Sequence, residues 1–250
     1  MTEDRMLQMH YGTCGQAASA LLGSGGSFPR ILAEHATATA ARVCTGTSRA
    51  LEVGCTVGGG TFALASMGAF GSVIGVDGDA SCISTAQRIA ETGELSFTER
   101  LEGELVERHA IALNADKSTR SRCSFRVMDP CCLSPELGAF DVVVVNNVLS
   151  RVVSPKSVLG RMGSARGLVA VGGVCVVADT FDWQDELTPR DSWLGGRRDD
   201  GQSSRASVAK IMSDSGFELV DECELPMVLP VTSRCVEMHA PCVSTWVRRS

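Results

Sequence analysis

The sequence predicts one α/β domain with a mostly parallel, doubly wound sheet of seven strands, an antiparallel strand near the C-terminus and a helical lid at the N-terminus. Three observations predict this fold. The apolar strand 50–53 runs into the glycine-rich segment 54–60. Strands and helices then alternate as far as residue 178, which is the pattern of a parallel sheet. Two final apolar runs follow one another without a helix between them and predict antiparallel pairing.

Prolines and capping side chains mark several helix starts. Pro29 and Pro155 suit first helical positions, and Asp79 is a candidate N-cap. The expected strands are 50–53, 72–76, 124–128, 140–145, 173–178, 218–225 and 235–247. The expected helices are 29–44, 61–67, the segment after Asp79, 155–165 and 203–215. The charged stretch 91–122 is expected to be partly helical and to end in a polar loop.

The chain is expected to form a single domain over residues 1–250 with four functional parts. An N-terminal lid and helix would occupy residues 1–45, and the cofactor-binding core 46–178. An insert over 179–200 would cover the substrate. A helix and strands would complete the domain over 201–250.

The composition favours a small-molecule partner. A net charge of -6 and a pI near 5.3 argue against nucleic acid or an anionic membrane surface. The longest apolar run, residues 168–178, is shorter than the roughly 20 residues that span a bilayer. The cysteines number 11, an odd count, and none of them shows zinc-ligand spacing. Reduced thiols in a cytoplasmic protein without a metal are therefore expected.

Carboxylates accompany three strands near the glycine-rich segment. Glu52 lies within the first strand, Asp77 follows the second and Asp129 the third. Because the carboxyl ends of parallel strands meet at one edge, we expect these acids around one crevice. Carboxylates repel phosphates, and Thr56 breaks the Gly-x-Gly-x-x-Gly pattern of dinucleotide-binding loops. An ammonium group, a sulfonium, ribose hydroxyls and an adenine amine fit better, which indicates S-adenosylmethionine.

The motif Glu-x-Gly-Cys-x-x-Gly at residues 52–58 resembles the first motif of class I S-adenosylmethionine-dependent methyltransferases, which have a Rossmann-like fold. The resemblance implies that its glycines let the backbone approach the methionine part. It also implies that Asp77 binds the ribose, Asp129 accepts from the adenine amine and Asn146 lies beneath the sulfonium. The complete set of expected cofactor-binding residues is Glu52, Gly54, Cys55, Gly58, Thr61, Asp77, Gly78, Asp129, Pro130 and Asn146.

A polar segment, residues 181–196, follows the fifth strand and carries two of the three tryptophans. It is expected to overhang the pocket that holds the methyl acceptor. Trp183 and Trp193 would enclose a planar ring, while Arg190 would bind a carboxylate. Acidic side chains in the same segment would meet an ammonium group. These features predict an aromatic amino acid or a relative of one as acceptor.

Over almost its whole length the chain resembles the C-terminal methyltransferase domain of ovothiol-biosynthesis enzymes, which also occurs as a separate protein. The matching segments are 10–12, 28–29, 52–58, 147–151, 187–196 and 243–249. The resemblance implies methylation of 5-thiohistidine at Nπ, the ring nitrogen on the side-chain side, to give ovothiol A. In the fused enzymes an iron-dependent sulfoxide synthase precedes this domain. This chain has only 4 histidines and no His-x-x-x-Glu-His run, so a separate synthase and lyase are expected to supply the substrate.

Three residues are candidates for catalysis. Tyr11 and His10 could handle the proton, or could pack the lid without transferring one. Asn147 would hold the acceptor ring in the required tautomer, and Arg151 or Arg190 would bind the carboxylate or thiolate. The acceptor-binding candidates are Phe28, Arg30, Asn147, Arg151, Thr180, Trp183, Arg190 and Trp193.

Three alternative functions share parts of this pattern. The chain could methylate another nitrogen, oxygen or thiol of a small amino-acid-like acceptor. It could be a methyltransferase-like subunit that keeps the fold and holds a partner without catalysis. A nicotinamide-dependent reductase is a third alternative, which Thr56 and the acidic crevice disfavour.

Overall fold

The computed structural model describes residues 1–12, 27–44, 47–67, 70–199 and 201–250, and it confirms the predicted fold class. Seven strands form one sheet in the order β5-β2-β1-β6-β7-β11-β8. Only β11 runs antiparallel to its neighbours. The strands of this sheet are β1 (Arg49–Val53), β2 (Ser72–Asp77), β5 (Cys123–Val127), β6 (Phe140–Asn146), β7 (Val169–Asp179), β8 (Phe217–Glu224) and β11 (Cys242–Arg248).

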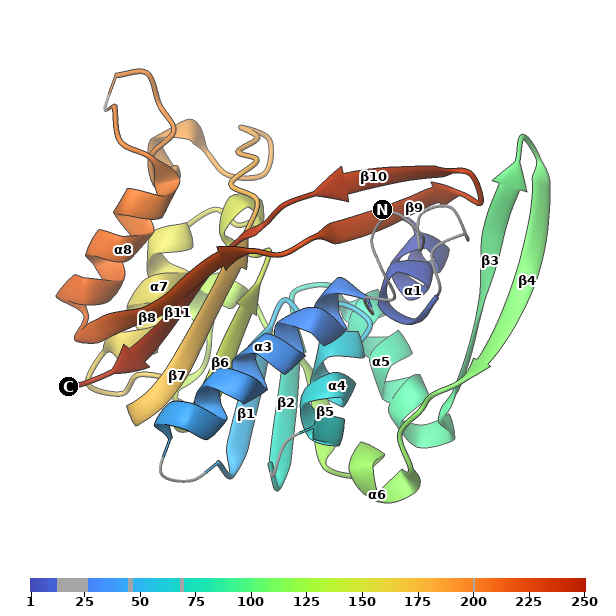
Figure 1. Ribbon diagram of the computed structural model, residues 1–250, viewed down its shortest axis with the longest axis horizontal. Coiled ribbons are helices and arrows are strands. Elements are labelled where there is room, and N and C mark those ends of the chain that lie inside the picture. The colour runs from blue at the N-terminus through green and yellow to red at the C-terminus, as the bar shows by residue number, and fades with distance from the viewer. Residues whose placement is uncertain (13–26, 45–46, 68–69, 200) are drawn as a thin grey trace.

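Helices cover both faces of the sheet (Figure 1). The helices are α1 (Glu3–Tyr11), α3 (Phe28–Val43), α4 (Gly59–Met67), α5 (Ala80–Thr92), α6 (Lys117–Arg120), α7 (Pro155–Gly163) and α8 (Ser204–Asp214). Side chains of α3, α4 and α5 belong to two buried clusters, and those of α7 and α8 belong to a third. The central strands are therefore buried on both sides, which explains the unbroken apolar run Val142–Val145.

The helix α5 illustrates how local sequence determines an element. Asp79 accepts hydrogen bonds from the amides of Ser81 and Cys82, as expected of an N-cap. The spacing of Ile83 and its neighbours on the same face buries one side of the helix against the sheet. Gly93 ends the helix with a left-handed φ of 75°.

The prediction for residues 91–122 was largely wrong, because this stretch forms a β-hairpin before the short helix α6. The hairpin pairs β3 (Glu94–Glu102) with β4 (Leu105–Ala112). Leu95 and Phe97 are buried and alternate with polar residues, which is the period of a strand. Gly103 provides the positive φ at the turn. Most of the charged residues of this stretch lie on the exposed side of a two-stranded ribbon.

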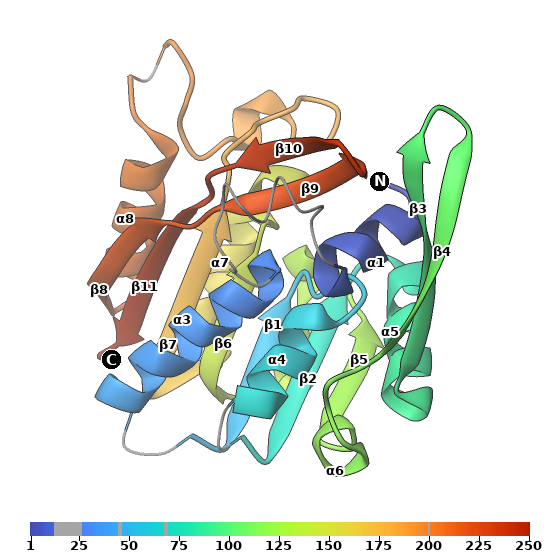
Figure 2. The same ribbon diagram turned by 45° about the vertical axis from the view of Figure 1, so that its right-hand side comes forward.

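The prediction of one strand over residues 235–247 was also wrong. The run divides into β10 (Cys235–His239) and β11, and β10 pairs with the additional strand β9 (Met227–Thr232). Pro241 lies between them, and a proline cannot donate to a sheet ladder. The β9–β10 hairpin consequently leaves the main sheet and crosses its upper edge (Figure 2).

Hydrogen bonds tie the β9–β10 hairpin to the rest of the molecule. Arg5 of α1 donates through Nε to the Pro230 carbonyl at 2.7 Å and pairs with Glu237 at 2.7 Å. At the turn, the Ser233 amide donates to the Arg100 carbonyl of β3 at 3.0 Å. The hairpin is thus held at its middle by α1 and at its tip by the β3–β4 hairpin.

Among the described residues, ten cysteines are free, and no group of three or more histidine, cysteine or acidic side chains could hold a metal ion. In the same part of the chain, no helix has the length and apolar character needed to cross a membrane.

Candidate functional site

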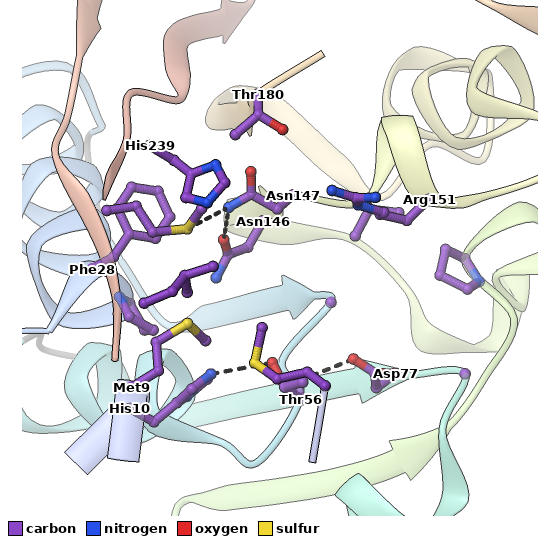
Figure 3. Close-up of a pocket in the computed structure, with 18 of the residues that line it drawn as sticks. Met9, His10, Phe28, Thr56, Asp77, Asn146, Asn147, Arg151, Thr180 and His239 are labelled. Atoms are coloured by element: carbon purple, nitrogen blue, oxygen red, sulfur yellow. Dashed lines mark hydrogen bonds between the residues drawn. The ribbon is translucent and has the colours of Figure 1, made fainter. Parts of the chain in front are cut away.

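A cavity of about 410 Å³ lies at the C-terminal edge of the sheet (Figure 3). Four strands supply one wall: Gly54 follows β1, Asp77 ends β2, Asn146 ends β6 and Thr180 follows β7. The chain winds outward in both directions from β1, and doubly wound sheets bind ligands at that point. Helices and the β9–β10 hairpin supply the opposite wall, with Met9, His10, Phe28, Pro29, Met227, Leu229 and His239.

Gly54 allows the first loop to pack closely against the end of β6. Its φ is 83°, and a Cβ there would lie 2.5 Å from Cγ2 of Val148 and 2.7 Å from the carbonyl oxygen of Asn146. No L-residue side chain fits at those distances. The geometry therefore requires a glycine here for packing against β6, and its expected approach to the methionine part stays a prediction.

Backbone hydrogen bonds fix Asp77 at the cavity wall. Its Oδ2 accepts from the Thr56 amide at 2.9 Å, and its Oδ1 accepts from the Asp79 amide at 3.0 Å. Thr56 has a φ of 46°, an uncommon conformation for a β-branched residue that directs its amide at the carboxylate. Each carboxylate oxygen keeps a further lone pair with which to accept from a hydroxyl group of a ligand.

Gly78 and Pro130 face each other at one end of the cavity. A Cβ at Gly78 would lie 3.9 Å from Cδ of Pro130, so any larger side chain would fill the space between them. Asp129 does not line the cavity: it is exposed and accepts from the Cys131 amide at 2.8 Å. It caps the turn that carries Pro130, instead of contributing a wall of the cavity as expected.

Glu52 lies behind the cavity wall, contrary to the expectation that it surrounds the ligand. Its side chain is 1% exposed, and a Cβ at Gly60 would collide with its carboxylate. Oε2 accepts from the Thr61 hydroxyl at 2.7 Å, and Oε1 accepts from Nδ2 of Asn146 at 3.2 Å. Burial raises the pKa of Glu52 to about 7 although both hydrogen bonds favour the charged form.

Three further residues of the expected cofactor set also lie outside the cavity lining. Cys55 and Thr61 are fully buried beneath the loop. Gly58 has a φ of 89° and packs on the ring of Phe125, which a Cβ would approach to 2.9 Å. These residues shape the loop and support α4. The lining therefore contains only five of the ten residues expected from sequence, namely Gly54, Asp77, Gly78, Pro130 and Asn146.

Asn147 lines the cavity and carries an amide oxygen without a partner. Its Nδ2 donates to Oδ1 of Asn146 at 3.2 Å and lies 3.5 Å from the sulfur of Met227. Its Oδ1 is buried and has no hydrogen-bond partner among the described residues. The backbone at Asn147 has a φ of 50°, and such conformations often mark functional sites. Glu52 accepts from the amide nitrogen of Asn146, whose oxygen then accepts from the amide nitrogen of Asn147. The amide oxygen of Asn147 is therefore the atom that remains free.

His10 and Tyr11 have their polar atoms occupied, which argues against the expected role in proton transfer. Nδ1 of His10 accepts from the Gly59 amide at 3.1 Å, and its Nε2 lies 3.2 Å from the Thr56 hydroxyl. Burial lowers the pKa of His10 to about 3. The Tyr11 hydroxyl donates to the Val57 carbonyl at 2.7 Å, and burial raises its pKa well above the ordinary value. Both side chains instead fasten α1 to the glycine-rich loop.

The two tryptophans of the 181–196 segment do not wall the cavity, so the structure corrects this expectation. Their rings stack on each other, with centroids 6.1 Å apart. Nε1 of Trp183 donates to the Ser204 hydroxyl, and Nε1 of Trp193 donates to the Thr188 carbonyl. Arg190 also lies outside the lining and is exposed, 3.8 Å from Asp199. Phe181 and Trp183 pack against the buried cluster that includes side chains of α8, which explains these two large rings.

The other acceptor candidates divide between two cavities. Phe28, Arg151 and Thr180 line the main cavity, as Asn147 does. Arg151 is exposed at the rim, 3.4 Å from a carboxylate oxygen of Asp182. Arg30 pairs with Glu34 on its own helix and borders a separate cavity of about 280 Å³, which Tyr11 also lines.

His239 is the site residue that sequence reasoning missed. It ends β10 and lines the main cavity, and its Nε2 is buried without a hydrogen-bond partner among the described residues. The available signal was Pro241, which breaks the run 235–247 and leaves His239 near the edge of the sheet where β11 begins. Met227 is its cross-strand partner on β9.

The sheet order and the cavity at its C-terminal edge define a Rossmann-like class I methyltransferase fold. The profile of the methyltransferase domain family matches residues 28–222. The chain therefore belongs to the methyltransferase domain family.

Solved structures of methyltransferases share this fold at low sequence identity. Magnesium protoporphyrin IX methyltransferase from Synechocystis PCC 6803, with bound SAH, has a TM-score of 0.57 and 16% identity, over 98% of this chain and 93% of that one. The N-methyltransferase NodS from Bradyrhizobium japonicum, in complex with S-adenosylhomocysteine, has a TM-score of 0.53 and 16% identity, over 88% and 86%. The glycopeptide N-methyltransferase MtfA, complexed with S-adenosylmethionine, has a TM-score of 0.52 and 12% identity, over 86% and 93%.

A short segment also matches a protein that is not named as a methyltransferase. It is 37% identical over 65 residues to 4-hydroxy-3-methylbut-2-enyl diphosphate reductase of Mycolicibacterium paratuberculosis. The match covers 26% of this chain and only 19% of that protein. A likeness of this extent carries no conclusion about activity.

Proposed function

We propose that this protein is an S-adenosylmethionine-dependent N-methyltransferase that converts 5-thiohistidine to ovothiol A by methylating Nπ of the ring. The observation that carries the proposal is the place of Asn147 in the cavity. Asp77 and Thr56 lie on one side of the Asn146–Asn147 pair, and His239 and Thr180 lie on the other (Figure 3). The cavity thus has a donor end and an acceptor end that meet at the two asparagines.

The donor end suits S-adenosylmethionine. The fixed carboxylate of Asp77 can accept from both ribose hydroxyls, and Gly78 and Pro130 line the neighbouring end of the cavity, beside which the adenine would lie. The cradle at Gly54, where a Cβ would clash, brings the backbone close to the methionine part. When bound there, the sulfonium supplies an electrophilic methyl group. Glu52 stays behind the wall and acts on the site only through Asn146.

The acceptor end suits a small ring with polar edges. Phe28 and Met227 provide apolar walls, and Oδ1 of Asn147 can accept from a ring N–H. Arg151 at the rim can bind the carboxylate of an amino acid. Further support for 5-thiohistidine is the sequence resemblance, of which the segment 147–151 lies in the cavity and the segment 187–196 does not.

The mechanism follows from the tautomer that Asn147 selects. If Oδ1 of Asn147 accepts from Nτ–H of the ring, the lone pair of Nπ is left free to attack. Positioning that nitrogen at roughly 3 Å from the methyl carbon, in line with the breaking bond, supplies most of the rate. The apolar side chains of Met9, Phe28 and Met227 exclude water from the path of the methyl group.

The proposal includes where the substrate comes from. We propose that a sulfoxide synthase and a lyase deliver 5-thiohistidine; the histidine ligand run of such synthases is absent from these 250 residues. We place the reaction in the cytoplasm, where reducing conditions keep the substrate thiol and the cysteines of this chain reduced.

An acceptor screen tests this proposal. The purified protein is incubated with S-adenosylmethionine and one acceptor in each of several parallel reactions. The acceptors are 5-thiohistidine, histidine and precursors of ergothioneine. Mass spectrometry then follows a gain of one methylene unit in each acceptor. We expect 5-thiohistidine to be methylated in preference to the others. If only a different acceptor is methylated, the protein is a methyltransferase of that small molecule instead. Calorimetry that detects no binding of S-adenosylmethionine would favour a non-catalytic subunit.

A further inference from the structure

We propose that His239 and Asn147 together read one edge of the acceptor ring, with His239 donating to the thiolate sulfur and Asn147 accepting from the adjacent ring N–H. This inference rests on the proposed function and goes beyond it, because it names the groups that determine both the substrate and the methylated nitrogen. It follows from four observations on the described residues.

The first observation is that two residues lining the same cavity each carry a buried polar atom without a partner. Oδ1 of Asn147 and Nε2 of His239 are buried and lack hydrogen-bond partners, and both residues line the main cavity. A buried polar atom without a partner is destabilising, so two of them on residues of one cavity indicate a ligand that satisfies both.

The second observation is that Met227 brings the two residues together. Nδ2 of Asn147 lies 3.5 Å from the sulfur of Met227, and Met227 is the cross-strand partner of His239 in the β9–β10 hairpin. The close-up shows His239 and Asn147 on the same side of the cavity (Figure 3). Since a strand end from the core and a hairpin strand meet here, the pair forms only when the hairpin lies over the sheet.

The third observation concerns which atoms donate and which accept. Glu52 accepts from Nδ2 of Asn146, so Oδ1 of Asn146 accepts from Nδ2 of Asn147, and the free atom of Asn147 is an acceptor. His239 carries the complementary group when Nε2 bears its proton. The cavity therefore offers an acceptor beside a donor, and it fits a ligand with a donor beside an acceptor.

The fourth observation is that 5-thiohistidine carries such an edge. The ring carbon that bears sulfur is bonded to Nτ, so the thiolate and Nτ–H are neighbours. Docking that edge on His239 and Asn147 turns the opposite edge, with the lone pair of Nπ, away from the pair and towards the donor end. One contact surface thus selects a thiolated ring and also exposes Nπ. Histidine lacks the sulfur and would leave Nε2 of His239 buried and unpaired.

Variants at His239 test this proposal. His239→Leu removes the donor, and His239→Gln keeps an N–H of similar reach. The matched control is His109→Leu on β4, outside the cavity lining, where the imidazole lies 2.9 Å from Glu99. Calorimetry with S-adenosylhomocysteine present measures the affinity for 5-thiohistidine and for histidine. NMR of the product measures the share of methyl on Nπ and on Nτ. Thermal melts and S-adenosylhomocysteine binding check the fold of each variant.

We expect His239→Leu to reduce the preference for 5-thiohistidine over histidine by roughly 10–100-fold, the worth of one hydrogen bond to a charged group. We also expect some Nτ-methyl product, because the ring can turn over. His239→Gln should restore most of both properties, and His109→Leu should change neither. An unchanged preference and unchanged regiochemistry in folded His239→Leu would overturn the proposal.

A second measurement observes the His239 ring directly, in protein that keeps this histidine. The side-chain resonances of the 4 histidines can be assigned from variants at positions 10, 35 and 109, which leaves His239 by elimination. Addition of 5-thiohistidine to the complex with S-adenosylhomocysteine should shift the His239 ring resonances. No shift would contradict the contact. Failure of the wild-type protein to bind or methylate 5-thiohistidine would refute the proposed function, and the inference with it. If the wild-type protein methylates 5-thiohistidine but His239 shows no resonance shift and its variants no effect, only the inference is refuted.

Discussion

Nδ2 of Asn146 donates to Oε1 of Glu52 at 3.2 Å, so an acid that lies outside the cavity orients an amide that lines it. The oxygen of Asn146 in turn accepts from Nδ2 of Asn147, so Glu52 also fixes the orientation of the second amide. The acidic residue of the first motif therefore orients two asparagines that line the cavity. This arrangement explains why Glu52 is buried at a cost while Asp77 meets the cavity directly.

The first prediction concerns the stability cost of Glu52. Burial raises its pKa from 4.5 to about 7, so the folded state holds this proton more tightly than the unfolded state. Stability from this group is present below about pH 4.5 and is lost as the pH rises to about 7. At higher pH the cost is about 3 kcal/mol. Glu52→Gln keeps an acceptor for Asn146 and removes the charge. We expect the variant to melt above the wild type at pH 8 and level with it near pH 5.

The second prediction concerns Asp77. Asp77→Ala removes the acceptors for the ribose and frees the amides of Thr56 and Asp79. We expect calorimetry to show S-adenosylhomocysteine binding weakened by roughly 10–100-fold, the worth of one to two hydrogen bonds with a charged group. Asp214→Ala is the matched control, since this carboxylate on α8 is exposed and pairs with Lys210. Equal affinity in both variants would place the cofactor elsewhere.

The third prediction separates a structural histidine from a catalytic one. The pKa of His10 is lowered from 6.5 to about 3, so the ring stays neutral in the folded protein. Its folded state binds fewer protons than the unfolded state, so stability is lost as the pH falls from about 6.5 towards 3. His10→Phe leaves the Gly59 amide unpaired and should cost about 1–3 kcal/mol of stability by denaturant titration. The pH dependence of turnover should keep its wild-type shape; a vanished acidic limb would restore His10 as the base.

The fourth prediction contrasts two arginines. Arg151 lines the cavity and Arg190 does not. Arg151→Ala should raise the Michaelis constant for the amino acid acceptor by about 10-fold or more, since it removes a charge-assisted hydrogen bond. Arg190→Ala should leave that constant within about 2-fold of the wild type, the range expected when no contact is lost. Steady-state kinetics with both variants show which arginine binds the acceptor carboxylate. A raised Michaelis constant in Arg151→Ala alone places the carboxylate at the rim of the cavity, and one in Arg190→Ala alone places it at the 181–196 segment.

The sheet could be predicted from sequence because each strand of its core is a short apolar run that ends at a polar or glycine residue. Asp79 and Pro155 marked helix starts correctly for the same reason, since capping is local chemistry. The two hairpins were missed where local signals conflicted. Around Phe97 the many charged residues obscure the alternation of a strand, and the apolar run 235–247 predicts one strand although Pro241 interrupts it.

The site was only partly predictable because its residues act at different depths. Gly54, Asp77 and Asn146 follow from strand ends, and the structure places them together. The position of Glu52 behind the wall depends on how α4 packs over β1, which the sequence pattern does not specify. Trp183 was expected at the ligand because it follows a strand end, but its ring packs on Trp193. His239 reaches the cavity through a hairpin whose path depends on contacts with α1 and β3.

The most direct test of the central claim is the position of the transferred methyl group. The wild-type protein is incubated with 5-thiohistidine and S-adenosylmethionine that carries an isotope-labelled methyl, and long-range NMR correlations locate the methyl on the ring. We predict correlations to the ring carbon between the nitrogens and to the carbon that bears the side chain, which identify Nπ. Correlation to the sulfur-bearing carbon, an S-methyl product or an unmodified ring would contradict the account.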